Sequence, residues 1–211
     1  MHNERHERKK IICIVGESCS GKDTLTRLAI EMYPLYYRES TPKMKEVVSY
    51  TTRPMRKSES QGVEHIFISS EEAEKMKQNQ TLLAYTKIKN PDFQGEGFEY
   101  FTTVDQLGEF NTYIIDPNGI NSMNSLVYNG IVELCIIYIK TPKIIRFLRS
   151  KKRGDDKIAY YNRINNEKKQ FELFRTMIKY NGYYNAHVIH NIFGFKHLKA
   201  KRICKIANKF L

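Results

Sequence analysis

Short hydrophobic runs of strand length recur along the chain, separated by longer stretches with helical patterning. Four of them are IICIV at 11–15, TYIID at 112–116, ELCIIYI at 133–139 and AHVIH at 186–190. Near-continuous hydrophobic strands are typical of a parallel sheet covered on both faces. Helices are predicted at about 23–33, 143–154 and 162–174, with an amphipathic helix at the C-terminus. This alternation predicts an α/β fold with helices on both faces of a parallel sheet.

A more polar segment between about 43 and 103 interrupts this alternation. Its strand-like stretches are VVSY at 47–50, HIFIS at 65–69, LLAYTKI at 82–88 and FEYFTT at 98–103. The last two flank a Gly/Pro-rich turn, which predicts an antiparallel pair. A polar helix at 71–78 is predicted to be capped by Ser69 or Ser70. We therefore expect one domain, with a core at about 10–42 and 104–211 and an inserted lobe at 43–103.

Proline and glycine predict where several elements end. Pro34 and Pro42 indicate an irregular connection after the first helix. PNG at 117–119 predicts a loop that leads into a helical stretch. Gly154 is predicted to end the basic helix at 143–154.

Composition favours a cytoplasmic protein. No hydrophobic run approaches the roughly 20 residues that span a bilayer. The charged N-terminus, MHNERHERKK, lacks the hydrophobic region of a secretory signal. The four cysteines form no C-x-x-C pair, so we expect reduced thiols rather than a disulfide framework or a zinc site.

The formal net charge of +12 suggests an anionic partner, either nucleic acid or small polyanions. Lys and Arg cluster at 5–10, 53–57, 146–153 and 196–209. The two inner clusters overlap phosphate-type motifs, whereas the terminal ones fit a solvated tail and a solvated helix face. No aromatic-basic motif supports a specific nucleic-acid partner, so small molecules are the expected ligands.

A phosphate-binding motif follows the first predicted strand. Residues 16–24 read GESCSGKDT and precede a helix, so Gly16, Gly21 and Lys22 have P-loop spacing. Asp23 stands where the P-loop hydroxyl is expected, and Thr24 supplies a hydroxyl one position later. Asp23 would face magnesium or cap the helix, and a glycine-rich turn without nucleotide is the alternative for the whole motif. The residues expected to hold ATP, with Mg²⁺ on its phosphates and on Asp23 or Thr24, are Gly16, Glu17, Ser18, Cys19, Ser20, Gly21, Lys22, Asp23 and Thr24.

A second anion-binding motif is SYTTRPMR at 49–56. Arg53 and Arg56 flank Pro54, and arginine makes bidentate bonds to phosphate. A surface arginine pair is the alternative. Together with the P-loop about 30 residues earlier, the string resembles the acceptor-binding signature of the guanylate kinase family. The resemblance runs from about Ile11 to Ala207, and it implies ATP-dependent phosphorylation of a nucleoside monophosphate, above all GMP or dGMP.

The resemblance also implies roles for single residues. The acceptor phosphate would be held by Ser49, Arg53, Arg56, Tyr100 and His65, the last standing where the family has tyrosine. Thr102 would face the base, and Phe101 replaces the family's usual glycine. Asp116 and Asn118, after the strand TYIID, would contact the acceptor, and Asp116 also magnesium.

One departure concerns base recognition. Ala84 aligns with the glutamate that reads the guanine edge in the family, and alanine accepts no hydrogen bond. Loss of such a contact can relax discrimination by orders of magnitude. The base or sugar of the acceptor is therefore left open.

Three arginines resemble the family's lid, at about 149–163. Arg149, Arg153 and Arg163 would neutralise the migrating phosphoryl group together with Lys22. A solvated basic helix end is the alternative. Asn191 resembles a position near the adenine pocket and would equally serve as a helix N-cap.

Two other functions stay open. GKDTL at 21–25 and EH at 64–65 also resemble ribose 1,5-bisphosphate phosphokinases, although the full TTRP-x-R string favours the first family. A non-catalytic guanylate-kinase-like binding module typically loses the P-loop lysine and the lid arginines, and both are present here. The sequence does not choose between a monomer and a homodimer.

Overall fold

The computed structural model describes residues 8–37, 43–55, 59–63, 65–88, 97–180, 182–183 and 185–211. Its main sheet is parallel, with strand order β6-β1-β7-β8. These strands are β1 (Lys9–Val15), β6 (Thr112–Ile114), β7 (Val132–Lys140) and β8 (Ala186–His190). They coincide with the four hydrophobic runs, so the predicted parallel sheet is confirmed.

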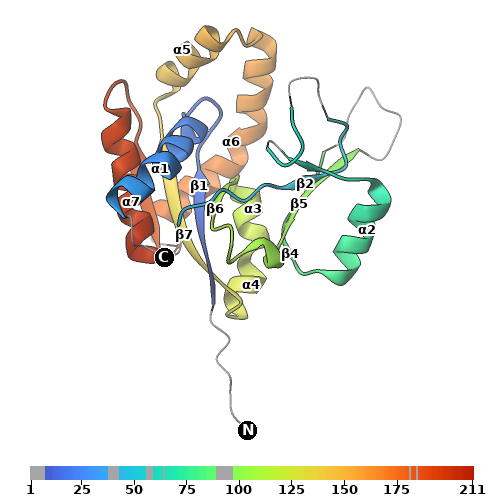
Figure 1. Ribbon diagram of the computed structural model, residues 1–211. Coiled ribbons are helices and arrows are strands. Elements are labelled where there is room, and N and C mark those ends of the chain that lie inside the picture. The colour runs from blue at the N-terminus through green and yellow to red at the C-terminus, as the bar shows by residue number, and fades with distance from the viewer. Residues whose placement is uncertain are drawn as a thin grey trace.

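Helices cover both faces of this sheet (Figure 1). One face carries α1 (Lys22–Tyr36) and α7 (Lys196–Phe210). The other face carries α3 (Pro117–Ser122), α4 (Asn124–Tyr128) and the lower part of α6 (Lys157–Lys179). The helix α5 (Lys143–Arg153) lies at the carboxyl end of the sheet and leads into α6.

The two hydrophobic clusters explain why the strands read as continuous hydrophobic runs. Successive side chains of a strand point to opposite faces. In β1, Ile12 and Ile14 pack in the cluster of α1 and α7, while Ile11, Cys13 and Val15 pack in the cluster of α3, α4 and α6. Because both faces are covered, Ile11 to Val15 are all buried, whereas Lys9 and Lys10 at the start of the strand are partly exposed.

Replacing Ile137 with alanine is expected to lower the free energy of unfolding by about 2–5 kcal/mol. Ile137 is fully buried near the middle of β7, and truncation leaves a cavity between β7 and the α1–α7 layer. Urea unfolding would measure the change. Ile158→Ala removes the same atoms from an exposed position of α6 and should stay within about 0.5 kcal/mol of the parent. Equal effects of the two substitutions would contradict this packing.

A second sheet lies beside the core, with strand order β3-β2-β5-β4. Its strands are β2 (Tyr50–Thr51), β3 (Ile66–Phe67), β4 (Leu82–Ile88) and β5 (Phe98–Thr103), followed by a 3-10 turn, η1 (Val104–Gln106). The predicted antiparallel pairing of β4 with β5 is confirmed. The helix α2 (Ser70–Asn79) begins with a capping box in which Ser69 and Glu72 bond each other's backbone amides.

The strand predicted at 47–50 is shorter than expected. Glu46 bridges Thr112 at the edge of the main sheet, and the Val47 amide donates to the Thr112 carbonyl (2.7 Å). Residues 46 and 47 therefore extend the core sheet, and only Tyr50 and Thr51 pair within the second one.

Two helix boundaries also differ from the sequence-based expectations. α1 continues past Pro34 to Tyr36, because a proline near a helix end costs only one backbone hydrogen bond and its fixed φ is helical. PNG at 117–119 is the first turn of α3 rather than a loop. Asp116 caps this helix by accepting from the Gly119 amide (2.8 Å), and proline suits the first helical position.

Two further expectations concern cysteines and membranes. All four cysteines are unpaired; Cys13, Cys135 and Cys204 are buried, and Cys19 is partly exposed. Among the described helices, none combines the length and hydrophobicity needed to cross a bilayer.

Candidate active site

The predicted phosphate-binding loop joins the carboxyl end of β1 to the first turn of α1 (Figure 1). Gly21 is the N-cap of α1, in the left-handed conformation (φ 84°, ψ 19°). The amino end of a helix presents free N–H groups and partial positive charge, which suits an anion. The fold therefore places residues 16–21 where a phosphate group can bind.

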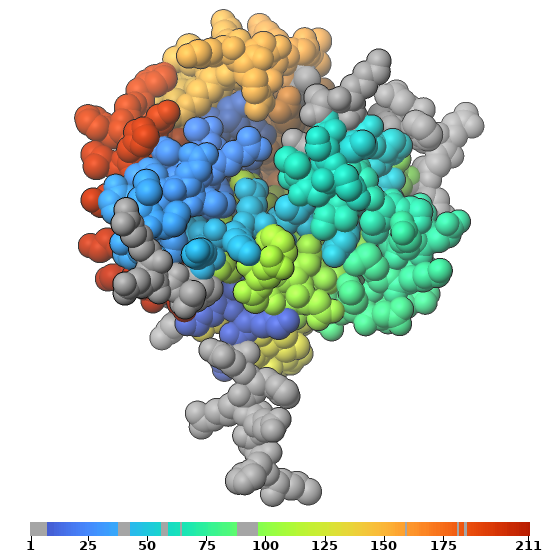
Figure 2. Space-filling view, viewed as in Figure 1, coloured from blue at the N-terminus to red at the C-terminus, as the bar shows by residue number. Residues whose placement is uncertain are grey.

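A cavity of about 490 Å³ joins this loop to the predicted lid. It is lined by Ser18, Cys19, Gly21, Lys22, Asp23, Thr24, Arg149, Arg153 and Arg163. In the space-filling view, the orange α5–α6 segment covers the upper part of the molecule next to the blue surface of α1, with the second sheet's teal segment beside them (Figure 2). Three arginines far away in sequence thus share one cavity with Lys22.

The backbone of the loop is held from three directions at one atom. The Ser20 carbonyl accepts from Thr141 Oγ1 (2.9 Å), Arg149 Nη1 (2.7 Å) and Asn191 Nδ2 (2.7 Å). In this structure Arg149, which was predicted to neutralise the migrating phosphoryl group, donates to the loop backbone and helps to position the loop. Burial lowers the pKa of its guanidinium. Asn191 is no helix N-cap, because Phe195 takes that position in α7.

Glycine is required at both ends of the loop by close packing. A Cβ at Gly16 would lie 2.5 Å from Ser20 Oγ and 3.0 Å from the Ile139 carbonyl oxygen. A Cβ at Gly21 would lie 2.7 Å from Asn191 Nδ2. Between them, Cys19 adopts φ 61°, which is uncommon outside glycine.

Gly21→Ala is expected to weaken ATP binding about tenfold or more and to destabilise the fold by about 1–3 kcal/mol. The new methyl group meets Asn191 and Arg149, so the loop must shift away from its anchors. Calorimetric titration with Mg-ATP and urea unfolding would measure both effects. Gly154→Ala has the same left-handed backbone with no atom within 4 Å, so it controls for backbone strain in the unfolding experiment. If both variants lose equal stability, the contacts of the new methyl group at position 21 do not contribute to the loss.

The side chains at the start of α1 provide one cation and two oxygen ligands. Lys22 is mostly covered, and its Nζ lies 3.7 Å from Asp23 Oδ2. Gly21 holds the N-cap position of α1, and no hydrogen bond found among the described residues joins the Asp23 carboxylate to an amide of the first turn. Asp23 and the Thr24 hydroxyl are exposed and line the cavity, and oxygen atoms of this kind suit Mg²⁺. The described residues form no cluster of three metal-ligating side chains. The donor set thus fits an ion held mainly by phosphates.

The outer lid arginines are held by one carboxylate. Arg153 donates to Asp155 through Nε (2.7 Å) and Nη2, and Arg163 Nη2 lies 3.8 Å from the same carboxylate. These interactions, led by the Arg153 hydrogen bonds, lower the pKa of Asp155 to about 2. Arg153 also lies 3.5 Å from Cys19 Sγ. Desolvation nonetheless raises the pKa of the Cys19 thiol.

Two predicted ATP ligands face helix α6 instead of the cavity's centre. The Ser18 amide and hydroxyl donate to Glu167, so this amide is not free for phosphate. Glu17 is buried and accepts from Tyr138 Oη (3.0 Å) and Arg175 Nη1 (2.9 Å). In this structure these groups bond residues of β7 and α6, and their part in phosphate binding stays a prediction. Their partners lie more than 120 residues away and carry no local sequence signal.

The second sheet assembles the predicted acceptor-binding residues. Arg53 Nε donates to Tyr100 Oη (3.1 Å), and the two ends of its guanidinium pair with Glu59 at 2.9 and 2.8 Å. Ser49 Oγ and His65 Nδ1 are 2.9 Å apart, and the His65 ring meets the edge of Tyr100. Sequence reasoning assigned Glu59 no role. Arg56 lies outside the described residues.

Thr102, which was predicted to face the base, is placed differently from expectation. Thr102 is completely buried, so its hydroxyl is not exposed to a ligand. Its cross-strand partner Ala84 belongs to the hydrophobic core, together with Leu83 and Val104. Position 84 supplies packing here instead of a hydrogen-bonding group.

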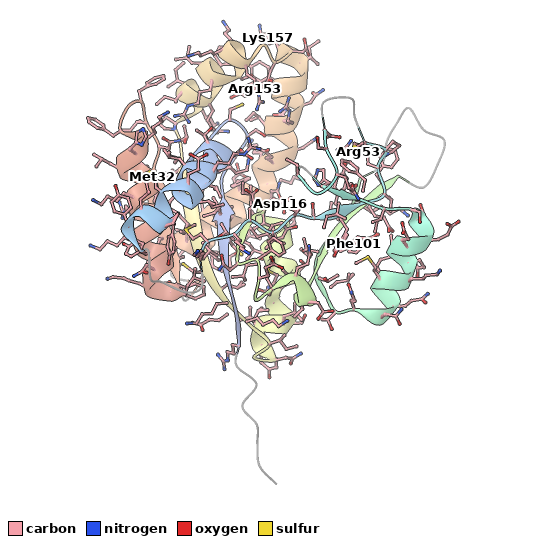
Figure 3. The ribbon with its side chains drawn as sticks, viewed as in Figure 1. Met32, Arg53, Phe101, Asp116, Arg153 and Lys157 are labelled. Atoms are coloured by element: carbon pink, nitrogen blue, oxygen red, sulfur yellow. The ribbon has the colours of Figure 1, made fainter. Side chains whose placement is uncertain are left out.

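Asp116 and Asn118 lie between the two sheets. Asp116 follows the end of β6, and α3, which it caps, packs against β4 of the second sheet. In the side-chain view Asp116 lies between the core and Arg53, while Arg153 lies above on α5 (Figure 3). Asp116 and Asn118 are both exposed, although Asp116 also serves α3 as its cap.

A further cavity of about 450 Å³ adjoins the loop at Gly21 and Asn191. Three exposed hydrophobic residues of the 191–195 loop line it, namely Ile192, Phe193 and Phe195. Sequence reasoning missed them, although two phenylalanines beside a glycine after a strand are a usable signal. Their side chains suit a planar, apolar group next to a phosphate chain.

Comparison with known proteins identifies relatives of this architecture. A family model described as guanylate kinase matches residues 8–188. The guanylate kinase of Mycoplasma pneumoniae is 28% identical over 171 residues, covering 76% of this chain and 64% of that protein. The guanylate kinase of Helicobacter hepaticus is 26% identical over 146 residues, covering 69% of this chain and 68% of that protein. The chain thus spans about two thirds of the length of these relatives.

A solved structure supports the fold. The crystal structure of guanylate kinase from Anaplasma phagocytophilum superposes with a TM-score of 0.56 at 15% identity, covering 96% of this chain and 86% of that one. At this identity the likeness concerns the fold alone.

Proposed function

Because this chain belongs to the guanylate kinase family, we propose that it transfers the γ-phosphoryl group of ATP to the phosphate of GMP or dGMP. The observation that carries the proposal is the single cavity shared by the phosphate-binding loop, Lys22 and the arginines of α5 and α6. Positioned cations are the main catalytic device of phosphoryl transfer. A cytoplasmic location, where both nucleotides are available, accords with this activity.

ATP binds with its phosphates at the amino end of α1. The free amides of the first turn and Lys22 contact the phosphates, and the cavity at Phe193 and Phe195 accepts the adenine. Thr24 or Asp23 would hold Mg²⁺ together with the phosphates, and the ion would supply positive charge to the transferring group.

The acceptor binds at the second sheet. Arg53 and Tyr100 meet at 3.1 Å, and Ser49 and His65 at 2.9 Å, so four polar groups converge on one region. Arg56 is proposed to join them. Glu59 already occupies the Arg53 guanidinium, so the incoming phosphate has to share or replace that carboxylate. Asp116 and Asn118 contact the nucleoside from the side of α3.

Catalysis follows from charge and position. An acceptor phosphate oxygen is already anionic at neutral pH, so no general base is required. Lys22, Arg153 and Arg163 balance the charge of the migrating phosphoryl group. The two arginines must leave Asp155 to do so, and this exchange accompanies closure of the lid. Arg149 keeps the loop in place throughout.

An acceptor panel tests the proposal. ADP release from Mg-ATP would be measured with GMP, dGMP, AMP, CMP, UMP, dTMP and ribose 1,5-bisphosphate. We expect turnover with GMP or dGMP at least tenfold above the others, with Asp116 or Asn118 doing the work that Ala84 cannot. Selective turnover of ribose 1,5-bisphosphate would keep the mechanism and replace the acceptor. If the protein binds ATP but phosphorylates none of these acceptors, the proposed enzymatic activity is contradicted.

A further inference from the structure

A separate cavity of about 640 Å³ lies between α7 and the amino ends of the core strands. It is distant from the phosphate-binding loop. Lys10 lines it at the start of β1, whereas the loop begins after Val15 at the other end of that strand. Five residues of strand span about 17 Å. None of its lining residues belongs to the two cavities at Gly21.

Polar residues line this cavity where the strand pattern calls for hydrophobic ones. On β1, β7 and β8, the residues that face α7 are hydrophobic near the carboxyl ends, as Ile14, Ile137 and Ile189 show. Lys10, Glu133 and His187 occupy the same face of these strands at their amino ends. Three adjacent strands thus depart from the pattern together, at one place.

α7 closes the cavity with three more cations. Arg202, Lys205 and Lys209 lie three and four residues apart, so they share one face of the helix. No ion pair found among the described residues involves any of the three. Across them stand His187 and Lys10, whose Nζ donates to the Leu211 carbonyl oxygen (3.3 Å), and of the described lining residues only Glu133 carries a side-chain carboxylate. The cavity therefore has a strong excess of positive charge.

His187 lies close to these positive charges. Its Nε2 lies 3.0 Å from Asn185 Oδ1. Burial lowers the pKa of His187, and so do the positive charges of Arg202 and Lys209. An anion placed among these groups would relieve that repulsion.

The remaining lining indicates the size and kind of ligand. Ile206 and Phe210 give one hydrophobic wall, and Lys10 Nζ lies 5.7 Å from the centre of the Phe210 ring. The volume is in the range of small-molecule sites. Cations gathered around a cavity suit a compact ligand better than an extended backbone, and lysine and arginine are the usual phosphate ligands. We propose that this cavity binds a small, multiply phosphorylated anion at the end of the sheet opposite the phosphate-binding loop.

The test uses inorganic tripolyphosphate and the imidazole resonances of His187. Tripolyphosphate also binds at Lys22, so a local signal is needed, and His187→Gln assigns it by loss of the resonance. We expect saturable shifts of the His187 resonance and a rise of its pKa by about half a pH unit or more when the cavity is filled. No change at His187 with the probe in large excess would overturn the proposal.

A charge-matched pair of variants separates the cavity from general attraction. Arg202→Ala/Lys205→Ala removes two exposed cations of the cavity and is expected to weaken the response at His187 about tenfold. Lys75→Ala/Lys169→Ala removes two exposed cations elsewhere, on α2 and on α6. The affinity of this control variant for tripolyphosphate, measured at His187, should stay within about twofold of that of the parent protein. If both pairs of substitutions weakened tripolyphosphate binding equally, net charge alone would explain the binding, and a defined site would be refuted.

Discussion

Replacing Lys22 with alanine is expected to lower kcat for phosphoryl transfer by about 10³-fold, the loss typical of removing one stabilising group from a charged transition state. Lys22 follows the loop directly in the first turn of α1, and it lines the cavity. The lid arginines start from contacts with Asp155 or Ser20 and cannot take its place without moving. ADP release with Mg-ATP and GMP would measure the change.

The Lys22 variant should fold normally, which makes its kinetics interpretable. The one ion pair of Lys22 within the described residues is a 3.7 Å contact with the exposed Asp23, and such contacts contribute little. Lys75→Ala, far from the loop on α2, serves as the control with equal charge loss. Retention of more than a tenth of the parental kcat would place the transferred phosphoryl group elsewhere.

Replacing Arg53 has the second largest expected effect. Arg53→Lys keeps the charge but removes the planar fork, so kcat/KM for GMP should fall about 10²-fold while KM for ATP stays within about threefold. The guanidinium uses all three nitrogens at once, on Tyr100 and Glu59, and lysine cannot reproduce that geometry. Steady-state kinetics with each substrate varied would separate the two constants.

The Glu59 carboxylate affects the interpretation of an Arg53→Ala variant, and its own substitution provides the control. Arg53→Ala would remove the bidentate partner of Glu59, a side chain about 10% exposed, and cost about 1–3 kcal/mol of stability. Adding Glu59→Gln should restore much of that stability without restoring activity. Recovery of activity in the double variant would show that Arg53 acts by folding alone and not by binding the acceptor.

The parallel sheet and the loop were predictable because their signals are local. IICIV and ELCIIYI are buried on both faces, and each shows it in its own composition. The loop has glycine at positions 16 and 21, where a Cβ atom would collide with neighbouring atoms. The arginines of the lid were found through a family resemblance, and the structure brings them to the loop.

The rest depends on distant partners. Glu17 and Ser18 turn toward α6 because Arg175 and Glu167 lie there, and nothing near residue 17 predicts that. Thr102 is buried and pairs with Ala84, next to an irregularity in the register of β4 and β5 between Leu82 and Ala84. Strand pattern alone does not fix which face such a residue takes.

The three donors on the Ser20 carbonyl have a consequence for the thermodynamics of ligand binding. They come from the end of β7, from α5 and from the loop after β8, so the whole core immobilises the loop before any nucleotide arrives. The loop therefore loses its conformational entropy when the protein folds, and not when the nucleotide binds. Binding of the triphosphate should accordingly show a small entropic penalty from this segment, with most reorganisation confined to the lid.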